Sequence, residues 1–269
     1  MRRMKLTMLG TGQAMVTKCY HTCFIMEEAG RCFLVDCGGG NTILSRLNQA
    51  GYQWLDIRDV FVTHKHLDHI LGALWMIRAF CEELAIDKMK GDVNFYGHDE
   101  VIALLRDMAT KLLKPSHVPF IDSRIHMNVV EDGETREIIG FPVTFFDIHS
   151  TKDKQFGFCM DRKSDGKICC CGDEPFQEHE RVFAEGSKWL LHEAFCLASE
   201  ADIFTPYEFH HSTVKDACKV AQRLGVPNVI LYHTEDSDLP RRKERYKEEG
   251  EKYFDGNIFV PDDLEVIEL

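Results

Sequence analysis

The residues that decide the fold stand at positions 64–69 and read His64-Lys65-His66-Leu67-Asp68-His69. A run of β-branched and apolar residues at 59–63 predicts a buried strand directly before them. Apolar residues at helical spacing over 70–84 predict a helix directly after them. Four side chains of metal-ligand type therefore occupy a six-residue turn that leads from a strand into a helix.

This turn can supply ligands to two metal ions. His64 and His66 alternate along an extended segment and can point to one side, whereas Asp68 and His69 stand where the chain enters the helix. Imidazole and carboxylate ligands suit zinc, manganese or iron better than calcium or magnesium. The alternative is a chance His-rich turn in which Asp68 only caps the helix. We regard it as the weaker interpretation, because short motifs with so many ligand-type residues are seldom without a function.

Composition limits the class of protein. The chain has 269 residues, 44% of them hydrophobic, so it can bury a large core and is not expected to be disordered. Its formal charge of −12 argues against a nucleic-acid-binding protein, since an acidic surface repels polyphosphates. The amino terminus lacks a long apolar segment, and eleven cysteines show no disulfide-scaffold spacing. We therefore expect a cytoplasmic protein with free thiols and no membrane span.

Further ligand-type residues stand where other predicted elements begin or end: His149, Asp173, His192, Glu193, His211 and His233. Each is weak evidence alone, because a single histidine at a strand end is more often an ordinary hydrogen-bonded residue. One turn cannot complete two metal sites, however, so these positions are candidates for the remaining ligands. We expect one domain over residues 1–269, since no repeat or low-complexity linker divides the chain.

The turn at 64–69 resembles the HxHxDH signature of the metallo-β-lactamase superfamily, and the order of the other motifs resembles its ribonuclease Z branch. The matching motifs are Leu9-Gly10-Thr11-Gly12, Asp36-Cys37-Gly38, Thr63 to His69, Gly172-Asp173, His192-Glu193-Ala194, His211-Ser212-Thr213 and Tyr232-His233-Thr234. The resemblance implies an α/β (α+β) fold, a four-layer αββα sandwich with two mixed sheets and helices outside. It also implies a metal-dependent hydrolase with two divalent ions, most simply zinc, with manganese or iron(II) as alternatives.

The same resemblance implies a role for each candidate residue. His64, His66 and His149 would hold the first metal. Asp68, His69 and His233 would hold the second, and Asp173 would bridge both. Asp68 would also be catalytic, and His211, with Glu193 behind it, would protonate the leaving group. An unperturbed histidine pKa of about 6.5 suits that task, and we expect Glu193 to favour the protonated imidazole.

Two departures from the branch concern the substrate. The tRNA-processing enzymes insert a long basic arm between the third-histidine motif and the bridging aspartate, but here only 24 positions separate His149 from Asp173. The Gly-Asp motif continues as Glu174-Pro175 instead of the usual threonine. These departures and the acidic charge argue against tRNA. We expect a small or short phosphodiester, such as a cyclic nucleotide or an RNA end.

Several alternatives remain open from the sequence. The same fold could hydrolyse a thioester, lactone or lactam, and a non-catalytic metal-binding or sensing module is a third interpretation. A homodimer is a weak expectation carried over from the branch. We expect Cys169, Cys170 and Cys171 to be buried strand residues. Four histidines are expected at the surface: His98, His117, His126 and His179.

Overall fold

The computed structural model describes residues 4–269, which form two compact units. The first unit comprises residues 4–10, 21–131 and 263–269, and the second comprises residues 11–20 and 132–262. Each unit contains one seven-stranded mixed sheet with its own helices. The single domain over residues 1–269 stays a prediction. Residues 1–3, part of the amino-terminal segment considered above for a signal peptide, lie outside the described residues.

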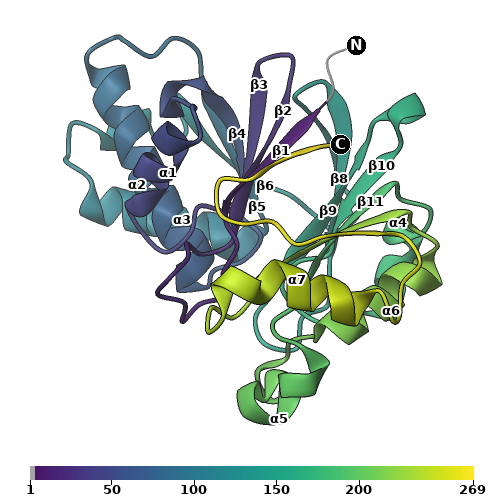
Figure 1. The fold of residues 1–269 in the computed structure, drawn as a ribbon. Helices are drawn as coiled ribbons and strands as arrows, with labels where there is room; N and C mark the ends of the chain where they lie inside the picture. The colour runs from purple at the N-terminus through teal and green to yellow at the C-terminus, as the bar shows by residue number, and fades with distance from the viewer. Residues whose placement is uncertain (1–3) are drawn as a thin grey trace. The chain divides into compact units, whose positions relative to one another are not determined.

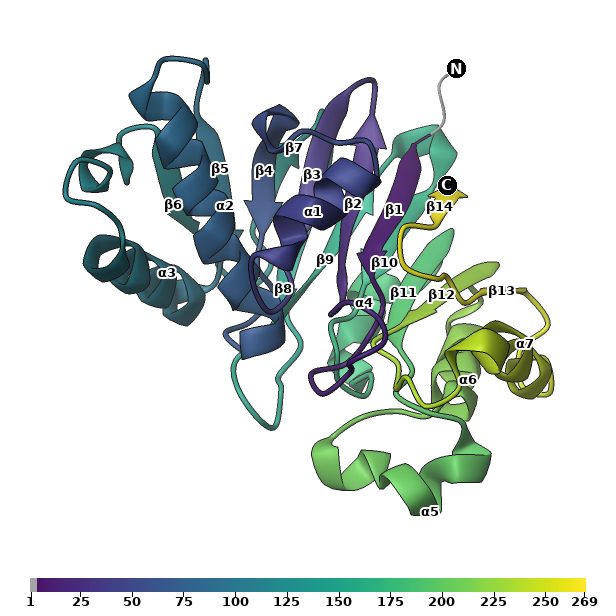
Figure 2. The same ribbon diagram turned by 60° about the vertical axis from the view of Figure 1, so that its left-hand side comes forward.

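The sheet of the first unit joins three antiparallel strand pairs to three parallel ones (Figure 2). In spatial order its strands are β14 (Val266–Glu268), β1 (Lys5–Gly10), β2 (Cys23–Glu28), β3 (Arg31–Val35), β4 (Ile57–Phe61), β5 (Val93–Gly97) and β6 (Ile125–Val129). Its helices are α1 (Thr42–Gln49), η1 (Trp54–Asp56), α2 (Leu67–Ala85), α3 (Asp99–Leu112) and η2 (Val118–Phe120). Each parallel connection carries a helix, because parallel strands need a crossover. The carboxyl ends of β3, β4 and β5 therefore meet at one edge.

Gly72 lets helix α2 contact the turn that follows β3. The Gly72 N–H donates to the carbonyl of Gly38 over 2.8 Å, and the Cys37 N–H donates to the carbonyl of His69 over 3.1 Å. A Cβ atom at Gly72 would lie 1.8 Å from the carbonyl oxygen of Cys37. Only glycine permits this approach, which fixes the first turn of α2 against the end of β3.

The sheet of the second unit has the same composition of pairs, three antiparallel and three parallel (Figure 1). In spatial order its strands are β13 (Asn257–Phe259), β12 (Asn228–Tyr232), β11 (Trp189–Glu193), β10 (Lys167–Cys170), β9 (Phe156–Asp161), β8 (Phe141–Asp147) and β7 (Thr135–Ile138). Its helices are η3 (Lys163–Asp165), η4 (Glu178–Glu180), α4 (Arg181–Ala184), η5 (Ala198–Glu200), α5 (Ala201–Phe204), η6 (Pro206–Phe209), α6 (Val214–Leu224) and α7 (Leu239–Gly250). The parallel strands β10, β11 and β12 end at one edge of this sheet, so the residues that follow them are neighbours.

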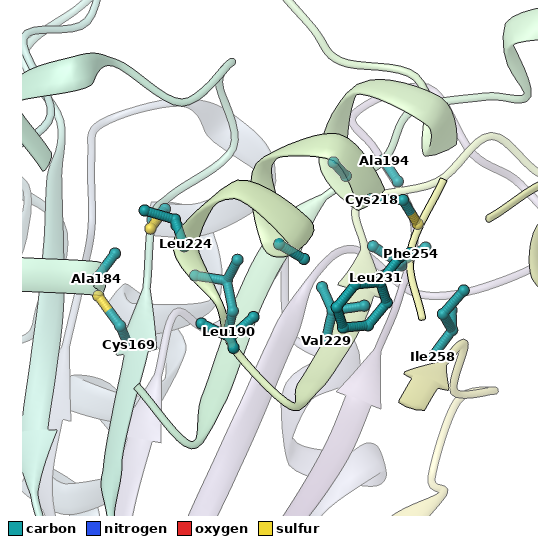
Figure 3. Packing of buried hydrophobic residues seen from close by; sticks show 14 of the residues in the cluster. Cys169, Ala184, Leu190, Ala194, Cys218, Leu224, Val229, Leu231, Phe254 and Ile258 are labelled. Atoms are coloured by element: carbon teal, nitrogen blue, oxygen red, sulfur yellow. The ribbon is translucent and has the colours of Figure 1, made fainter. Parts of the chain in front are cut away.

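A hydrophobic cluster between this sheet and its helices forms the core of the second unit (Figure 3). Leu190 and Leu231 contribute from the strands, and Cys218 and Leu224 contribute from α6. Cys169, Cys170 and Cys171 are all buried and free, as expected. These cysteines fill space in and next to β10 and form no disulfide.

A buried carboxyl group, Glu180, lies at the edge of this core. It is 0% exposed, and its Oε1 accepts the N–H of Gln177 over 2.7 Å. Burial raises the pKa of Glu180 to about 8. Between its unfolded pKa and about 8 the folded chain therefore binds more protons than the unfolded chain, so its contribution to stability falls as pH rises.

We predict that ionisation of Glu180 lowers the free energy of unfolding by about 3 kcal/mol as the pH rises from 5 to 8. Glu180→Gln keeps the acceptor oxygen for Gln177 and cannot ionise, so the variant should lose that part of the pH dependence. Chemical denaturation of both proteins at pH 5, 6.5 and 8 measures the difference. Parallel stability curves for the two proteins would show that Glu180 does not titrate in this way.

Two expectations about this fold were wrong. The sequence pattern at 137–148 predicts one strand, but these residues lie in the hairpin β7–β8, because Ile139 and Gly140 turn the chain with φ of 47° and 91°. His98 and His117, expected at the surface, are 0% and 3% exposed because they lie at the starts of α3 and η2 against the first unit's core. Within residues 4–269, no helix combines the length and the apolar character needed to cross a membrane.

Candidate metal centre

The first unit presents its ligand-type residues between β4 and α2. The backbone stays extended through His66, the N-cap residue of α2, and Asp68 lies in the first turn, where a negative charge interacts favourably with the helix dipole. His64, Asp68 and His69 are buried, and His66 is half-buried. The ring nitrogens Nε2 of His64 and Nδ1 of His66 lie 2.8 Å apart, and His69 Nε2 lies 3.2 Å from Asp68 Oδ2.

Asp36 orients two of these imidazoles. Its Oδ1 accepts the Thr63 N–H over 2.8 Å, and its Oδ2 accepts both the Thr63 hydroxyl over 2.9 Å and His69 Nδ1 over 2.7 Å. Since the hydroxyl proton of Thr63 goes to Asp36, its oxygen accepts His64 Nδ1 over 2.9 Å. Both histidines therefore carry their protons on Nδ1 and present the lone pair of Nε2, as metal-binding histidines do.

The second unit brings Asp173 and His233 together at the ends of β10 and β12. His233 Nε2 lies 3.4 Å from Asp173 Oδ2. Gln155 Nε2 donates to Asp173 Oδ1, which leaves Oδ2 directed at the imidazole. His233 has a left-handed backbone with φ of 58°, an uncommon conformation for a residue with a side chain. Such strain is concentrated at functional sites.

His211 and Glu193 form a second buried pair in this unit. The Glu193 carboxylate is 0% exposed, and its Oε1 accepts the N–H of Ser212. Its Oε2 lies 3.8 Å from His211 Nδ1, and within the described residues neither atom has a hydrogen-bond partner. The His211 ring stacks on Phe195 and lies 5.2 Å from the His233 ring, measured between centroids. The pair is therefore placed next to a ligand candidate.

The donor atoms of each unit fit a divalent transition metal. Each unit places an imidazole Nε2 close to a carboxylate oxygen, at 3.2 Å in the first and 3.4 Å in the second. In the first unit the carboxylate of Asp36 also fixes the tautomer of His69. Such a set suits zinc, manganese or iron(II), and a carboxylate behind a ligand histidine is usual at such sites.

Comparison with known proteins identifies the family of this chain. The sequence profile described as "Anti-Pycsar protein Apyc1" matches residues 4–253, which is most of the chain. The chain belongs to the Apyc1 family.

The chain is also similar to three further proteins. The Apyc1-family chain is 25% identical to a protein named ribonuclease Z from Thermococcus sibiricus, with 99% of this chain and 96% of the relative covered. Its structure is similar to the metallo-β-lactamase fold protein YhfI from Bacillus subtilis, with a TM-score of 0.79 at 19% identity and full coverage of both chains. It is also similar to human tRNase Z, short form, with a TM-score of 0.75 at 20% identity and 98% of each chain covered.

These findings confirm the predicted fold and class. The two mixed seven-stranded sheets with their helices match a metallo-β-lactamase fold, and the chain is a ribonuclease Z-like metal-dependent hydrolase. The absence of an arm has a structural counterpart in this Apyc1-family member. Residues 149–173 contain only the hairpin of β9 and β10 and its short connections.

The contacts of His149 are with His179 and Asp147, not with the Asp173–His233 pair. Its side chain is exposed, and its ring stacks on His179 with 3.8 Å between centroids. The His149 N–H donates to Asp147 Oδ1 over 2.8 Å, and φ is 53°, another left-handed histidine at a strand end. His179, expected at the surface, is half-buried because it carries this stack and contacts the carbonyl oxygen of Asp147. The ligand role of His149 stays a prediction.

Burial acts on the pKa values of both members of the His211–Glu193 pair. Burial, and secondarily the neighbouring His233, lower the pKa of His211 to about 3. Burial raises the pKa of Glu193 well above its ordinary value. Burial therefore opposes the charged form of both groups, which lie 3.8 Å apart.

Three residues near this pair were missed by sequence reasoning: Gln155, Lys152 and Glu174. Gln155 holds Asp173, and Glu174 is buried and accepts hydrogen bonds from the turn after His149. The only signal in the sequence was the replacement of the usual threonine by Glu174 after Gly172-Asp173. His192, one of the candidate ligand positions, is buried, and its Nδ1 lies 2.7 Å from the Glu193 carbonyl oxygen.

Proposed function

We propose that this Apyc1-family chain is a dinuclear metal-dependent phosphodiesterase that acts on a small or short phosphodiester, with a cyclic mononucleotide as the preferred class. In this proposal residues 1–269 act as one metallo-β-lactamase domain that binds two divalent ions, zinc in the first instance. The observation that supports it most directly is the short distance between an imidazole Nε2 and a carboxylate oxygen in each unit. This distance is 3.2 Å between His69 and Asp68 and 3.4 Å between His233 and Asp173. The relatives named ribonuclease Z support phosphodiester chemistry.

The proposed ligands follow the assignment made from the sequence. His64, His66 and His149 would bind one ion, Asp68, His69 and His233 the other, and Asp173 both. Bound divalent ions lower the pKa of a water nucleophile and neutralise charge on phosphoryl oxygens. Asp36 would keep His69 and, through Thr63, His64 in the tautomer that binds a cation.

The protein side chains then serve the departing group. In hydrolysis a water oxygen forms a new bond to phosphorus, the ester P–O bond breaks, and the leaving alkoxide takes up a proton. Asp68 would orient the water, and His211 would give the proton, with Glu193 behind its Nδ1. The stack of His211 on Phe195 fixes the ring for that transfer.

The short span between His149 and Asp173 and the charge of −12 favour a small substrate over tRNA. The test is hydrolysis of 3′,5′-cyclic mononucleotides, a short single-stranded RNA and a precursor tRNA by the full chain loaded with zinc or manganese. We expect opening of the cyclic esters to nucleoside monophosphates and no processing of the tRNA. Hydrolysis of a thioester or lactone without any phosphodiester hydrolysis would contradict the proposal.

A further inference from the structure

The turn Ser150-Thr151-Lys152, hereafter the 150–152 turn, follows His149 at the point where the tRNA-processing relatives continue into an arm. It is held by Glu174, whose side chain is only 4% exposed. Glu174 Oε1 accepts the Ser150 hydroxyl over 2.5 Å, and Oε2 accepts the Thr151 N–H over 3.1 Å. The Lys152 N–H donates to Ser150 Oγ over 3.1 Å and closes the turn.

A second anchor holds the same turn from the other side. Thr151 Oγ1 lies 2.7 Å from His210 Nδ1. The two anchors are the sequence neighbours of two proposed site residues, because Glu174 follows Asp173 and His210 precedes His211. The turn is thereby fixed to the chain segments that carry those side chains.

Lys152 brings a positive charge to this place. Its ammonium lies 3.8 Å from Glu174 Oε1, beyond hydrogen-bonding distance, and makes no hydrogen bond to any other residue within 4–269. The ammonium is therefore ion-paired with Glu174, and its three N–H donors remain available to a ligand. The charge also reaches the neighbouring pair, since it lowers the pKa of both His211 and Glu193.

We propose that the 150–152 turn is a substrate-binding element in which the Lys152 ammonium binds a phosphate oxygen of a small phosphodiester. The inference rests on the proposed function and names the residue that attracts the anionic substrate. Because the chain has a formal charge of −12, a local positive charge such as that of Lys152 is needed to attract an anionic phosphate to the site. Hydrolysis converts a diester with one negative charge into a monoester that can carry two, so this contact strengthens toward the product.

The test compares Lys152→Met with Lys152→Arg and with Lys154→Met. Lys154 is a matched control, because it is another half-buried lysine two positions away, and its ammonium lies over the Phe156 ring at 5.5 Å from the centroid. The zinc-loaded full chain is assayed with a cyclic mononucleotide, and inorganic phosphate is titrated as a competitive inhibitor. Circular dichroism and thermal unfolding check that each variant is folded.

We expect Lys152→Met to lower kcat/KM and to raise the inhibition constant of phosphate, each by about 10- to 100-fold, the value of one charge-assisted hydrogen bond. Lys152→Arg should retain most of the affinity, and Lys154→Met should resemble the wild type. Equal phosphate affinity in Lys152→Met and Lys154→Met would overturn the inference while leaving the phosphodiesterase intact. A wild-type protein that hydrolyses no phosphodiester would instead overturn the proposed function on which the inference rests.

Discussion

Asp68→Ala is expected to lower the turnover number for a bis-aryl phosphodiester by about a thousandfold or more. At such sites, substitution of a residue that only supports a metal ligand lowers metal affinity or activity by about 10- to 100-fold. Asp68 is proposed both to bind metal and to orient the water, so its loss should cost more. Its carboxylate is buried and lies 3.2 Å from His69 Nε2, and alanine offers no oxygen atom at that position. Steady-state turnover of the chromogenic ester by zinc-loaded protein measures the loss.

Loss of the fold must be separated from loss of chemistry in this experiment. Asp68 is an acidic residue in the first turn of α2, so its removal also weakens the helix by about 0.3–1 kcal/mol. Asp99→Ala is the matched control, because Asp99 is likewise an acidic residue in the first turn of a helix, α3, and has no proposed role in the site. Asp99→Ala should keep full turnover, and both variants should unfold cooperatively. Turnover that persists in folded Asp68→Ala would contradict the proposed dinuclear site.

His211→Ala is expected to slow substrates with poor leaving groups far more than substrates with good ones. A nitrophenolate leaves without a proton, whereas the alkoxide of a nucleoside needs one as the P–O bond breaks. Loss of a general acid costs about 10²- to 10⁴-fold, so hydrolysis of a cyclic nucleotide should fall within that range. Hydrolysis of a bis-nitrophenyl ester should fall by less than about tenfold.

The series of leaving groups is its own control in this experiment. A plot of log kcat against the leaving-group pKa should be steeper for His211→Ala than for the wild type. His211 is only 8% exposed and stacks on Phe195, so the alanine variant also leaves a cavity that thermal unfolding will detect. Equal slowing of all the esters would remove His211 from the leaving-group role.

The sequence was sufficient for the parts of the fold in which local pattern and tertiary structure agree. Helix α2 follows the ligand turn as expected, because its apolar residues repeat at helical spacing from residue 70 onward. The hairpin of β2 and β3 follows from two short apolar runs around Gly30. The strands β13 and β14 were missed, because three residues each are too short for a periodic pattern and their pairing depends on partners far along the chain.

The candidate site divides in the same way. The turn 64–69 could be predicted, since its ligand-type residues are adjacent in sequence and need no tertiary information. Asp36 ends a predicted strand near the ligand turn, so the sequence indicates it as a hydrogen-bond partner for a ligand histidine. The sequence does not say which histidine, because the contact with His69 joins residues 33 positions apart. Burial of His211 and Glu193, and hence the direction of their pKa values, depends on packing that no local pattern encodes. Lys152 and its anchor Glu174 could not be found for the same reason.

The most direct test of the dinuclear phosphodiesterase is the return of metal to chelator-treated protein. The full chain is stripped of metal, zinc is added back in known equivalents, and bound metal and phosphodiester turnover are measured in the same samples. The account predicts that turnover is lost on stripping, rises with added zinc and stops rising at about two ions per chain. Turnover that survives complete removal of metal, or that never appears in protein holding two ions, would contradict it.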